Sequence, residues 1–430
     1  MSLDSRPTSI DRSFVLATGF GTTAAMWGVG YVCRLPSVLA PSGIVLALML
    51  VCLSGGGLVA GRLTGGGFLA GAASGAVTSV LNLLVLGSLL GGSSAGRIVP
   101  SALWWLPGSI LAGVVVAGLA AMAGSRASVP PEEPRDWTAA FAKVAAATTV
   151  LLLILGGVVT SKEAGLAVVD WPRSLGYNMF LYPLSRMTGG IYYEHAHRLF
   201  GSLVGLTTVV LAVHLHRVEG RRLVRRLSLV AAALVIVQGI LGGLRVTEVN
   251  IYLAVAHAVL AQVFFCVLVS VAVLTSKTWK RAPAPTGAGG ADRTLCMILV
   301  AFLLAQLALG AALRHLDAAL LVHGGLGIAL LPLAVFCGTR ALDPARNAPT
   351  LRASGWILIH LAIAQVGLGL GALVATRLLP QGPAPGPWSV TLATAHQGTG
   401  ALLLASAVAL TLWHHRLRTL APPAPPGSRG

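Results

Sequence analysis

Four histidines lie within otherwise apolar stretches of this sequence, where ionisable residues are costly and mark candidate functional sites. His197 begins one apolar run, in "YYEHAHRLFGSLVGL", and His257 lies early in another, in "LAVAHAVLAQVFF". His323 and His396 occupy similar places further along, in "VHGGLGIALL" and "LATAHQGTGALLL". Neutral imidazoles bind both haem iron and zinc. We therefore interpret the four histidines as metal ligands.

The two pairs of histidines belong to an apparent internal repeat. "LGGVVTSKEAGL" at 155–166 aligns with "LGAALRHLDAAL" at 309–320, and the segment that begins at His197 aligns with the one that begins at His323. Gln238 follows His197 by 41 residues, and Gln365 follows His323 by 42. The second histidines of the two copies align likewise. Apolar composition alone does not superpose intramembrane histidines and glutamines, so we infer a duplicated four-helix unit.

The placement of each pair favours haem over zinc. In each copy, one histidine starts the second helix and the other lies in the first part of the fourth helix, so both are expected at similar depth near one face of the membrane. Two imidazoles that approach from separate helices suit the two sides of a flat macrocycle. Zinc usually adds cysteine or carboxylate ligands in a tetrahedral set. The glycines in "GSLVGL" and "HGGLG" leave room for a large planar group.

A carboxylate accompanies only the first pair. On a helix, Glu194 lies near the same face as His197, whereas His195 points elsewhere, because successive residues are separated by about 100°. Glu194 is therefore a candidate general base, proton acceptor or ligand orienter, and a salt bridge with Arg198 is the alternative. The position equivalent to Glu194 in the second copy is Leu320. The two halves are thus chemically unequal.

Three arginines flank the ends of apolar runs near the histidines: Arg198, Arg245 and Arg314. A guanidinium there could pair with a haem propionate, although ordinary snorkelling towards the interface explains each arginine as well. His214, His216, His414 and His415 fall among arginines at the opposite helix ends, which is typical of interfacial residues. The sequence leaves three roles open, those of His195, His315 and His360.

The elements that must position these residues are membrane helices. The chain has 430 residues, of which 55% are hydrophobic and 10% are charged, against roughly 25% charged in a soluble domain. Long uninterrupted apolar runs favour helices over a membrane barrel. We expect an all-α polytopic bundle of about twelve transmembrane helices, the last eight forming two pseudo-symmetric four-helix halves. The twelve runs are 13–33, 35–61, 63–96, 98–125, 144–161, 199–213, 227–244, 249–276, 294–313, 318–339, 353–376 and 388–413.

The distribution of basic residues predicts the orientation of the chain. The net charge is +17, but the basic residues lie beside apolar runs, where the positive-inside rule explains them without nucleic acid. With a cytoplasmic N-terminus, 21 of the 30 lysines and arginines fall inside, including the dense segment "HRVEGRRLVRR". We therefore expect a multi-pass protein of the plasma membrane with its histidine pairs towards the outer face. The first run lacks a convincing cleavage site and is expected to remain as an anchor.

Two breaks rich in Pro, Gly, Ala and charge divide the chain, at 124–136 and 276–293. They predict an extra four-helix membrane block at 1–126, an N-terminal half at 127–280 and a C-terminal half at 281–430 that ends in a disordered tail. The five cysteines are single residues within apolar runs, and no two of them form a CxxC motif. This pattern is typical of cysteines that are buried as small apolar side chains.

Over about residues 144–415, the sequence resembles the haem A synthase family. The resemblance rests on "GGVVTSKEAGLAVVDWP" from Gly156, on "YYEHAHRLFGS" with the family's E-x-x-H-R pattern at 194–198, and on "QGILGGLRVT", "AHAVLAQVFF" and "AHQGTGALLL", which occur in the family's order. It implies eight transmembrane helices in two four-helix halves.

The resemblance also implies an activity, which is oxidation of the C8 methyl group of haem O to the formyl group of haem A for cytochrome oxidase. It implies that the substrate haem lies between His197 and His257, with Glu194 important for the oxidation. A haem b cofactor would lie between His323 and His396. Haem O synthase and cytochrome oxidase assembly factors are the implied protein partners besides the lipid bilayer. The oligomeric state is left open, with a homo-oligomer as one option.

The sequence departs from the family pattern in two respects. The loop at 162–193 contains no cysteine, where some members carry a pair, and the block at 1–126 is an addition for which we expect a docking or stabilising role. Two other classes of function remain open at this point. One is a dihaem electron-transfer cytochrome. Glu194 beside His197, and an "AGLAVVDWP" loop that could cover a substrate, count against it because electron transfer alone requires neither. The other is a transporter, which repeats favour but paired histidines do not.

Overall fold

The structure is a computed structural model that describes residues 11–87, 99–128, 133–282, 290–343, 348–380 and 382–417. These parts are almost entirely helical, and 11 of their helices are long and apolar enough to cross a membrane. The all-α fold of a multi-pass membrane protein is thereby confirmed. The tail at 421–430, expected to be disordered, lies outside the described residues.

The number of membrane-spanning candidates is one lower than expected, because α1 (Arg12–Cys33) is not among them. The helix forms where the sequence predicts it, and Asp11 caps it by accepting a hydrogen bond from the amide of Ser13 at 2.8 Å. Glycines and threonines lower its hydropathy. Its large side chains, such as Phe14 and Trp27, are instead buried against protein. A helix shielded by neighbouring helices needs less apolar surface than one that faces lipid.

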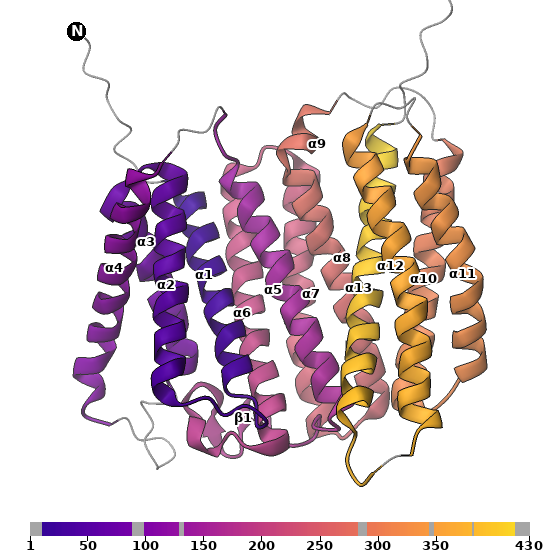
Figure 1. The fold of residues 1–430 in the computed structure, drawn as a ribbon, viewed down its shortest axis with the longest axis horizontal. Helices are drawn as coiled ribbons and strands as arrows, with labels where there is room; N and C mark the ends of the chain where they lie inside the picture. Colours follow the sequence, from indigo (N-terminus) through magenta and orange to yellow (C-terminus); the bar gives the residue numbers. More distant parts are fainter. Residues whose placement is uncertain are drawn as a thin grey trace, which may run out of the picture. The chain divides into compact units, whose positions relative to one another are not determined.

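The chain forms two compact units, of which unit 1 comprises residues 1–275 and 381–394. Figure 1 shows its helices running side by side, with the hairpin strand β1 at one end of α1 and α6. We call this the loop end of unit 1. Beyond α1, the helices of unit 1 are α2 (Ser42–Thr64), α3 (Gly67–Leu86), α4 (Ala102–Arg126), α5 (Trp137–Ser161), α6 (Gly189–Val218), α7 (Arg222–Thr247) and α8 (Ile251–Thr275).

Within unit 1, α5 to α8 form a closed four-helix set. Contacts run from α5 to α6, from α6 to α7, from α7 to α8 and from α8 back to α5. Several helices are longer than their apolar runs, and α6 reaches 30 residues. Helices continue past charged residues at a membrane surface, since such side chains can reach water or bind protein there. The extra turns of α6 carry Glu194 and His195.

Unit 2 comprises residues 276–380 and 395–430. Its helices α10 and α11 are in contact, as are α11 and α12, and Trp279 of α9 packs on Trp413 of α13 with ring centres 5.1 Å apart. The described helices are α9 (Lys277–Arg281), α10 (Ala291–Leu316), α11 (Leu320–Ala341), α12 (Pro349–Leu373) with a π turn at Val374–Leu378, and α13 (Pro387–Arg416), which enters this unit at residue 395.

The extra N-terminal block is packed through small residues. Gly57 and Gly61 of α2 lie directly against the backbone of α4 at Ala117 and Ala121, and Gly71 of α3 lies against the same helix. A side chain at any of these glycines would collide with main-chain atoms that cannot move separately. Close contact of helix backbones through small residues is how membrane helices associate without a hydrophobic driving force.

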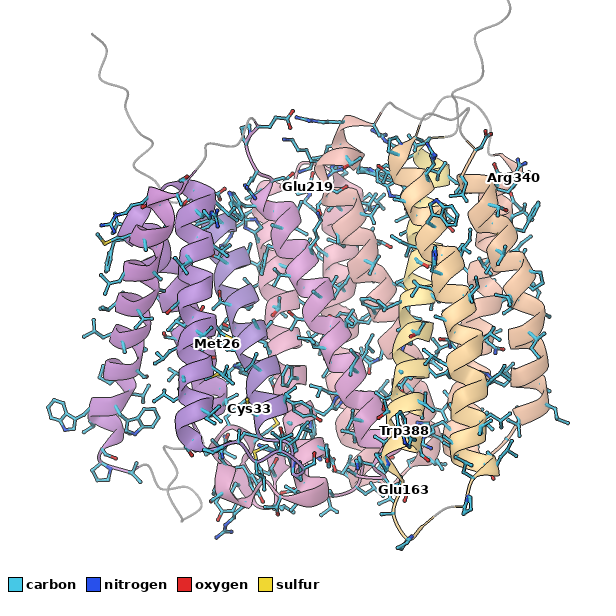
Figure 2. The ribbon with its side chains drawn as sticks, in the orientation of Figure 1. Met26, Cys33, Glu163, Glu219, Arg340 and Trp388 are labelled. Carbon is cyan, nitrogen blue, oxygen red and sulfur yellow. The ribbon has the colours of Figure 1, made fainter. Side chains whose placement is uncertain are left out.

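The block is joined to the following helices through α1. Trp27 packs edge-on against Phe200 of α6 with ring centres 5.5 Å apart, and Tyr31 stacks on Tyr192 at 5.4 Å. The hydroxyl of Tyr192 also donates to the main-chain oxygen of Tyr31 at 2.5 Å. Figure 2 shows Cys33, the last residue of α1, at the same end of unit 1 as Glu163, with Glu219 at the opposite end.

We predict that Gly61→Ala destabilises unit 1 by about 1–3 kcal/mol, the usual cost of overpacking, and lowers the thermal midpoint in detergent. Gly55→Ala is the matched control on the same helix, because a methyl group at Gly55 meets nothing within 4 Å. Equal midpoints for the two variants would contradict the close packing of α2 on α4.

Candidate functional site

Each of the four sequence-predicted histidines lies against a glycine of the preceding helix. A methyl group placed on Gly156 of α5 would lie 3.1 Å from Cε1 of His197, and one on Gly242 of α7 would lie 3.1 Å from Cε1 of His257. In unit 2, a methyl group on Gly310 would lie 3.0 Å from Cε1 of His323, and one on Gly369 would lie 2.8 Å from Cε1 of His396. Any larger residue would displace the imidazole. The glycines therefore fix where each ring lies.

The two rings of the unit 2 pair are separated by a distance compatible with a bis-histidine metal site. The ring centres of His323 and His396 are 6.1 Å apart, and the rings are inclined at 86°. Two metal–nitrogen bonds of about 2 Å each, with roughly 1 Å from each nitrogen to its ring centre, give a separation of about 6 Å. The residues present thus fit an iron held between two imidazoles.

Main-chain contacts orient both rings of unit 2. Nδ1 of His323 lies 3.2 Å from the carbonyl oxygen of Gln306, and Nδ1 of His396 lies 3.1 Å from that of Gln365. If Nδ1 carries the proton in each bond, Nε2 retains a lone pair for a metal. Metal-binding histidines usually donate their second N–H in this manner, which fixes the ring and raises its basicity.

The pair in unit 1 is close together but is held differently. His197 and His257 lie near enough for their charges to interact. The amide of Gln238 donates to the carbonyl oxygen of His257 at 3.0 Å. Nδ1 of His197 is buried and has no hydrogen-bond partner among the described residues. The four histidines are therefore alike in their glycine contacts and unlike in their hydrogen bonds.

Zinc-like clustering does not occur in the described parts of the chain. No group of three or more His, Cys, Asp or Glu side chains converges there to hold a metal ion. The histidines instead approach one another two at a time, each from its own helix.

Glu194 is the buried carboxylate beside the unit 1 pair, and both of its oxygens are occupied. Oε1 accepts a hydrogen bond from Arg198, one turn further along α6, at 2.8 Å. Oε2 accepts one from the main-chain amide of Val168 at 2.9 Å. The salt bridge that the sequence left as an alternative is thus present. Glu194 joins α6 to the loop at 162–188.

Arg198 is the centre of this attachment. Its guanidinium donates to the carbonyl oxygens of Asp170 at 2.7 Å, Arg173 at 3.1 Å and Val168 at 2.6 Å, in addition to Glu194. A planar guanidinium offers five donors in a fixed fork, so one arginine can bind several carbonyls that a lysine could not. Arg198 therefore binds the loop backbone along six residues.

The loop contains a short hairpin that the sequence did not predict. Strand β1 (Arg173–Ser174) pairs with β2 (Tyr177–Asn178), and the two turn residues, Leu175 and Gly176, both have positive φ. The carboxylate of Asp170 accepts their amides at 2.6 and 2.8 Å. Although partial burial of Asp170 opposes ionisation, these backbone hydrogen bonds and nearby Arg198 hold its pKa below the ordinary value. The hairpin could have been recognised in the sequence from Asp170, an acidic residue five positions before the Leu175–Gly176 turn.

His195, whose role the sequence left open, also binds this hairpin. The side chain is 1% exposed, its Nδ1 lies 3.1 Å from the hydroxyl of Ser174, and its ring packs on Tyr182. Successive residues of one helix therefore serve different purposes. Glu194, His195 and Arg198 hold the loop, whereas His197 faces His257.

The same loop reaches α7. Trp171 lies across Gly243, where a side chain would collide with the indole ring. Arg245 donates to the carbonyl oxygen of Gly165 at 3.1 Å, and it interacts electrostatically with Glu194 and with His197. The loop thus covers the helix ends next to the unit 1 pair.

Two of the remaining sequence candidates lie at exposed positions in unit 2. Arg314 is exposed near the end of α10, and His360 is exposed on α12, with Nδ1 2.8 Å from the carbonyl oxygen of Trp356. His214, expected at an interface, is instead buried and lies 3.2 Å from the hydroxyl of Thr138. The five cysteines are free, and three of them are buried.

We predict that Arg198→Lys opens the loop. Because a lysine cannot bind three carbonyls and a carboxylate together, trypsin should cleave after exposed Arg173 about tenfold faster, as expected when charged hydrogen bonds worth roughly 1.5–3 kcal/mol are lost. Arg217→Lys, at the other end of the same helix, is the control. Unchanged cleavage in Arg198→Lys would show that the guanidinium does not hold the loop.

Comparison with known proteins gives one family. No curated protein matches the chain. Residues 139–325 match the family described as cytochrome oxidase assembly protein, and the matched segment contains His197, His257 and His323 together with Glu194 and Arg198. Residues 139–325 are thus similar in sequence to the cytochrome oxidase assembly protein family, and they lie largely within the segment that resembles haem A synthases.

Proposed function

We propose that the protein is a haem A synthase, which oxidises the C8 methyl group of haem O to a formyl group and so makes haem A for cytochrome oxidase. The observation that carries the proposal is the family match over 139–325, because it spans the helix with Glu194, His197 and Arg198. The pairing of histidines supports haem as the bound group, and the carboxylate and loop beside one pair only support chemistry in that half.

The two pairs have different tasks in this proposal. His197 and His257 hold the substrate haem in unit 1, and His323 and His396 hold haem b in unit 2. Haem b, when bound, supplies one-electron transfer. The 6.1 Å between the rings of the second pair supports its role as an axial pair. Leu320, at the place equivalent to Glu194, provides no proton acceptor, so unit 2 is assigned ligation alone.

The loop at 162–188 serves as a lid over the substrate half. Its Val168 is 0% exposed, and its Trp171 lies on Gly243 at the end of α7. A covered site excludes water, and exclusion of water strengthens electrostatic interactions and suppresses side reactions. Opening requires release of Arg198 from the loop carbonyls.

Glu194 is the proton acceptor of the reaction. Its Oε2 accepts one hydrogen bond, from the amide of Val168 at 2.9 Å, and retains a lone pair that can take a proton. Proton transfer therefore takes place where the lid is attached to α6. A positioned carboxylate contributes typically 10²–10⁴-fold to such a step.

Arg245 is the preferred propionate partner among the three candidate arginines. Arg198 already donates to four protein oxygens, whereas the hydrogen bond of Arg245 is to one loop carbonyl, at 3.1 Å. Arg245 also interacts electrostatically with His197. It can therefore pair with an anionic group beside the unit 1 histidines while it still touches the lid.

The membrane arrangement follows from the basic residues. We place the N-terminus in the cytoplasm and the loop end towards the outer face, since Arg217, Arg221, Arg222, Arg225 and Arg226 cluster around the opposite end of α6 and α7. Haem O synthase and cytochrome oxidase assembly factors are the proposed partners for delivery of substrate and for use of the product.

Co-expression with a haem O synthase, followed by extraction and chromatography of haems, tests the proposal. We expect haem A to appear only when this protein is present. A folded, haem-loaded protein that yields only haem B and haem O would overturn the synthase assignment and favour a dihaem electron-transfer cytochrome.

We predict that Glu194→Gln retains haem but lowers formation of haem A by 10²-fold or more, because the amide cannot accept the proton. Since Glu194 also binds the lid, tryptic cleavage after Arg173 should be measured on the same sample. Arg198→Lys is the comparison. Equal loss of product in both variants would assign Glu194 to lid closure and not to proton transfer.

We predict that His323→Ala or His396→Ala depletes haem b while haem O still binds, because each variant removes one axial ligand of unit 2 alone. The pyridine haemochrome spectrum of the extracted haems measures the result. Loss of haem O with retention of haem b would reverse the assignment of the two halves.

A further inference from the structure

Three of the four histidines are preceded by a glutamine and a glycine in fixed spacing. The glycine that seats each ring follows a glutamine by four residues on the same helix, as in Gln238 with Gly242 and Gln306 with Gly310. Gln365 precedes Gly369 in the same way. Residues four apart lie one above the other on a helix face, so the glutamine and the glycine contact the same neighbouring helix.

Each glutamine side chain contacts its histidine, two of them at the main-chain carbonyl oxygen and one at the ring. The side-chain amide of Gln306 donates to the carbonyl oxygen of His323 at 2.7 Å, and that of Gln238 donates to the carbonyl oxygen of His257 at 3.0 Å. The amide nitrogen of Gln365 lies 3.5 Å from Nε2 of His396. We call each set of glutamine, glycine and histidine a clasp.

A second glycine completes the clasps in unit 2. This glycine follows the histidine by four residues and is Gly327 in one clasp and Gly400 in the other. A methyl group on Gly327 would lie 2.9 Å from the amide nitrogen of Gln306, and one on Gly400 would lie 3.0 Å from that of Gln365. Each helix of the pair thus has a glycine where a side chain of the other helix packs: one glycine contacts the imidazole and the other contacts the glutamine amide. Both rings of unit 2 also have their Nδ1 bonded to a glutamine carbonyl oxygen.

His197 is the exception. The residue four before its seat is Leu152, which has no amide. The glycine four after it is Gly201, where an added methyl group meets nothing within 4 Å. Its Nδ1 does not set His197 apart, because among the described residues of unit 1 neither Nδ1 of His197 nor Nδ1 of His257 makes the main-chain hydrogen bond that both rings of unit 2 make. At the place of the glutamine α5 therefore has Leu152, so the side-chain amide that accompanies the other three histidines is missing beside His197.

We propose that Leu152 makes unit 1 the half that releases its haem. The inference rests on the proposed function, in which unit 1 must accept a substrate and discharge a product while unit 2 keeps its cofactor. Unit 2 holds its haem through two clasped histidines, and unit 1 through one. Loss of such a supporting contact typically weakens binding by 10–100-fold. Leu152 is thus a positioning residue that acts through His197.

Transfer of haem from the purified, haem-loaded protein to excess apomyoglobin tests this. We expect two phases, and His396→Ala assigns the slow phase to unit 2 by removing it. Leu152→Gln should slow the fast phase at least tenfold, because the amide enters the open place beside Gly201. Gln306→Leu should accelerate the slow phase 10–100-fold.

Leu152→Met and Gln306→Met are the matched controls, since methionine keeps the volume and lacks an amide. Leu152→Met should transfer haem at the wild-type rate, and Gln306→Met should behave as Gln306→Leu. Tighter retention in Leu152→Gln is a gain that damaged packing would not produce. Should that variant fail to fold, Gln306→Leu carries the test alone.

The outcomes separate this inference from the function on which it rests. A purified protein that binds no haem in either unit would overturn both. A protein with two haems whose transfer rates are unchanged by Leu152→Gln and by Gln306→Leu would overturn the role of the clasps and leave the synthase assignment intact.

Discussion

The contact between an imidazole and a bare stretch of helix backbone is the constraint on which the rest of this structure depends. Each ring reaches its place because the neighbouring helix has a glycine there, with an added methyl group only 2.8–3.1 Å from the ring. That contact fixes the distance between helices, and the distance in turn decides which side chains meet one turn away. The glutamine bonds are possible only because the backbones are already close. Helix spacing, ring orientation and ligand support thus follow from single glycines.

A second layer of the site is built from backbone atoms. Besides the side-chain contacts of His195, the lid is held to α6 through its main chain, since Arg198 and Glu194 bind main-chain carbonyls and an amide of the loop. Such bonds depend on the path of the loop and only weakly on its side chains. The turn itself is set by Asp170, which binds two further amides. The loop can therefore vary in sequence at most positions and still close over the same helix ends.

Much of the fold and half of the site could be predicted from the sequence. Apolar runs gave the helices, because lipid leaves no alternative for backbone hydrogen bonds, and alignment of the copies separated His197 from His195. The helix α1 forms where the sequence predicts it, but a hydrophobic run does not reveal which helix is shielded by others. The hairpin and the bonds of Arg198 were missed because they join distant backbone atoms and carry no periodic signal. Gln306 was visible through its spacing to Gly310, but its partner became evident only with the neighbouring helix in place.

The added N-terminal helices have a consequence for quaternary structure. Through Trp27 and Tyr31, α1 occupies a face of α6 along several turns, and Tyr192, two residues before Glu194, bonds to its backbone. That face is closed to any other protein. A second copy of the chain, or a protein that delivers or collects a bound group, cannot contact this face of α6. It must approach unit 1 from another direction. The block thus restricts the directions from which another protein can reach α6.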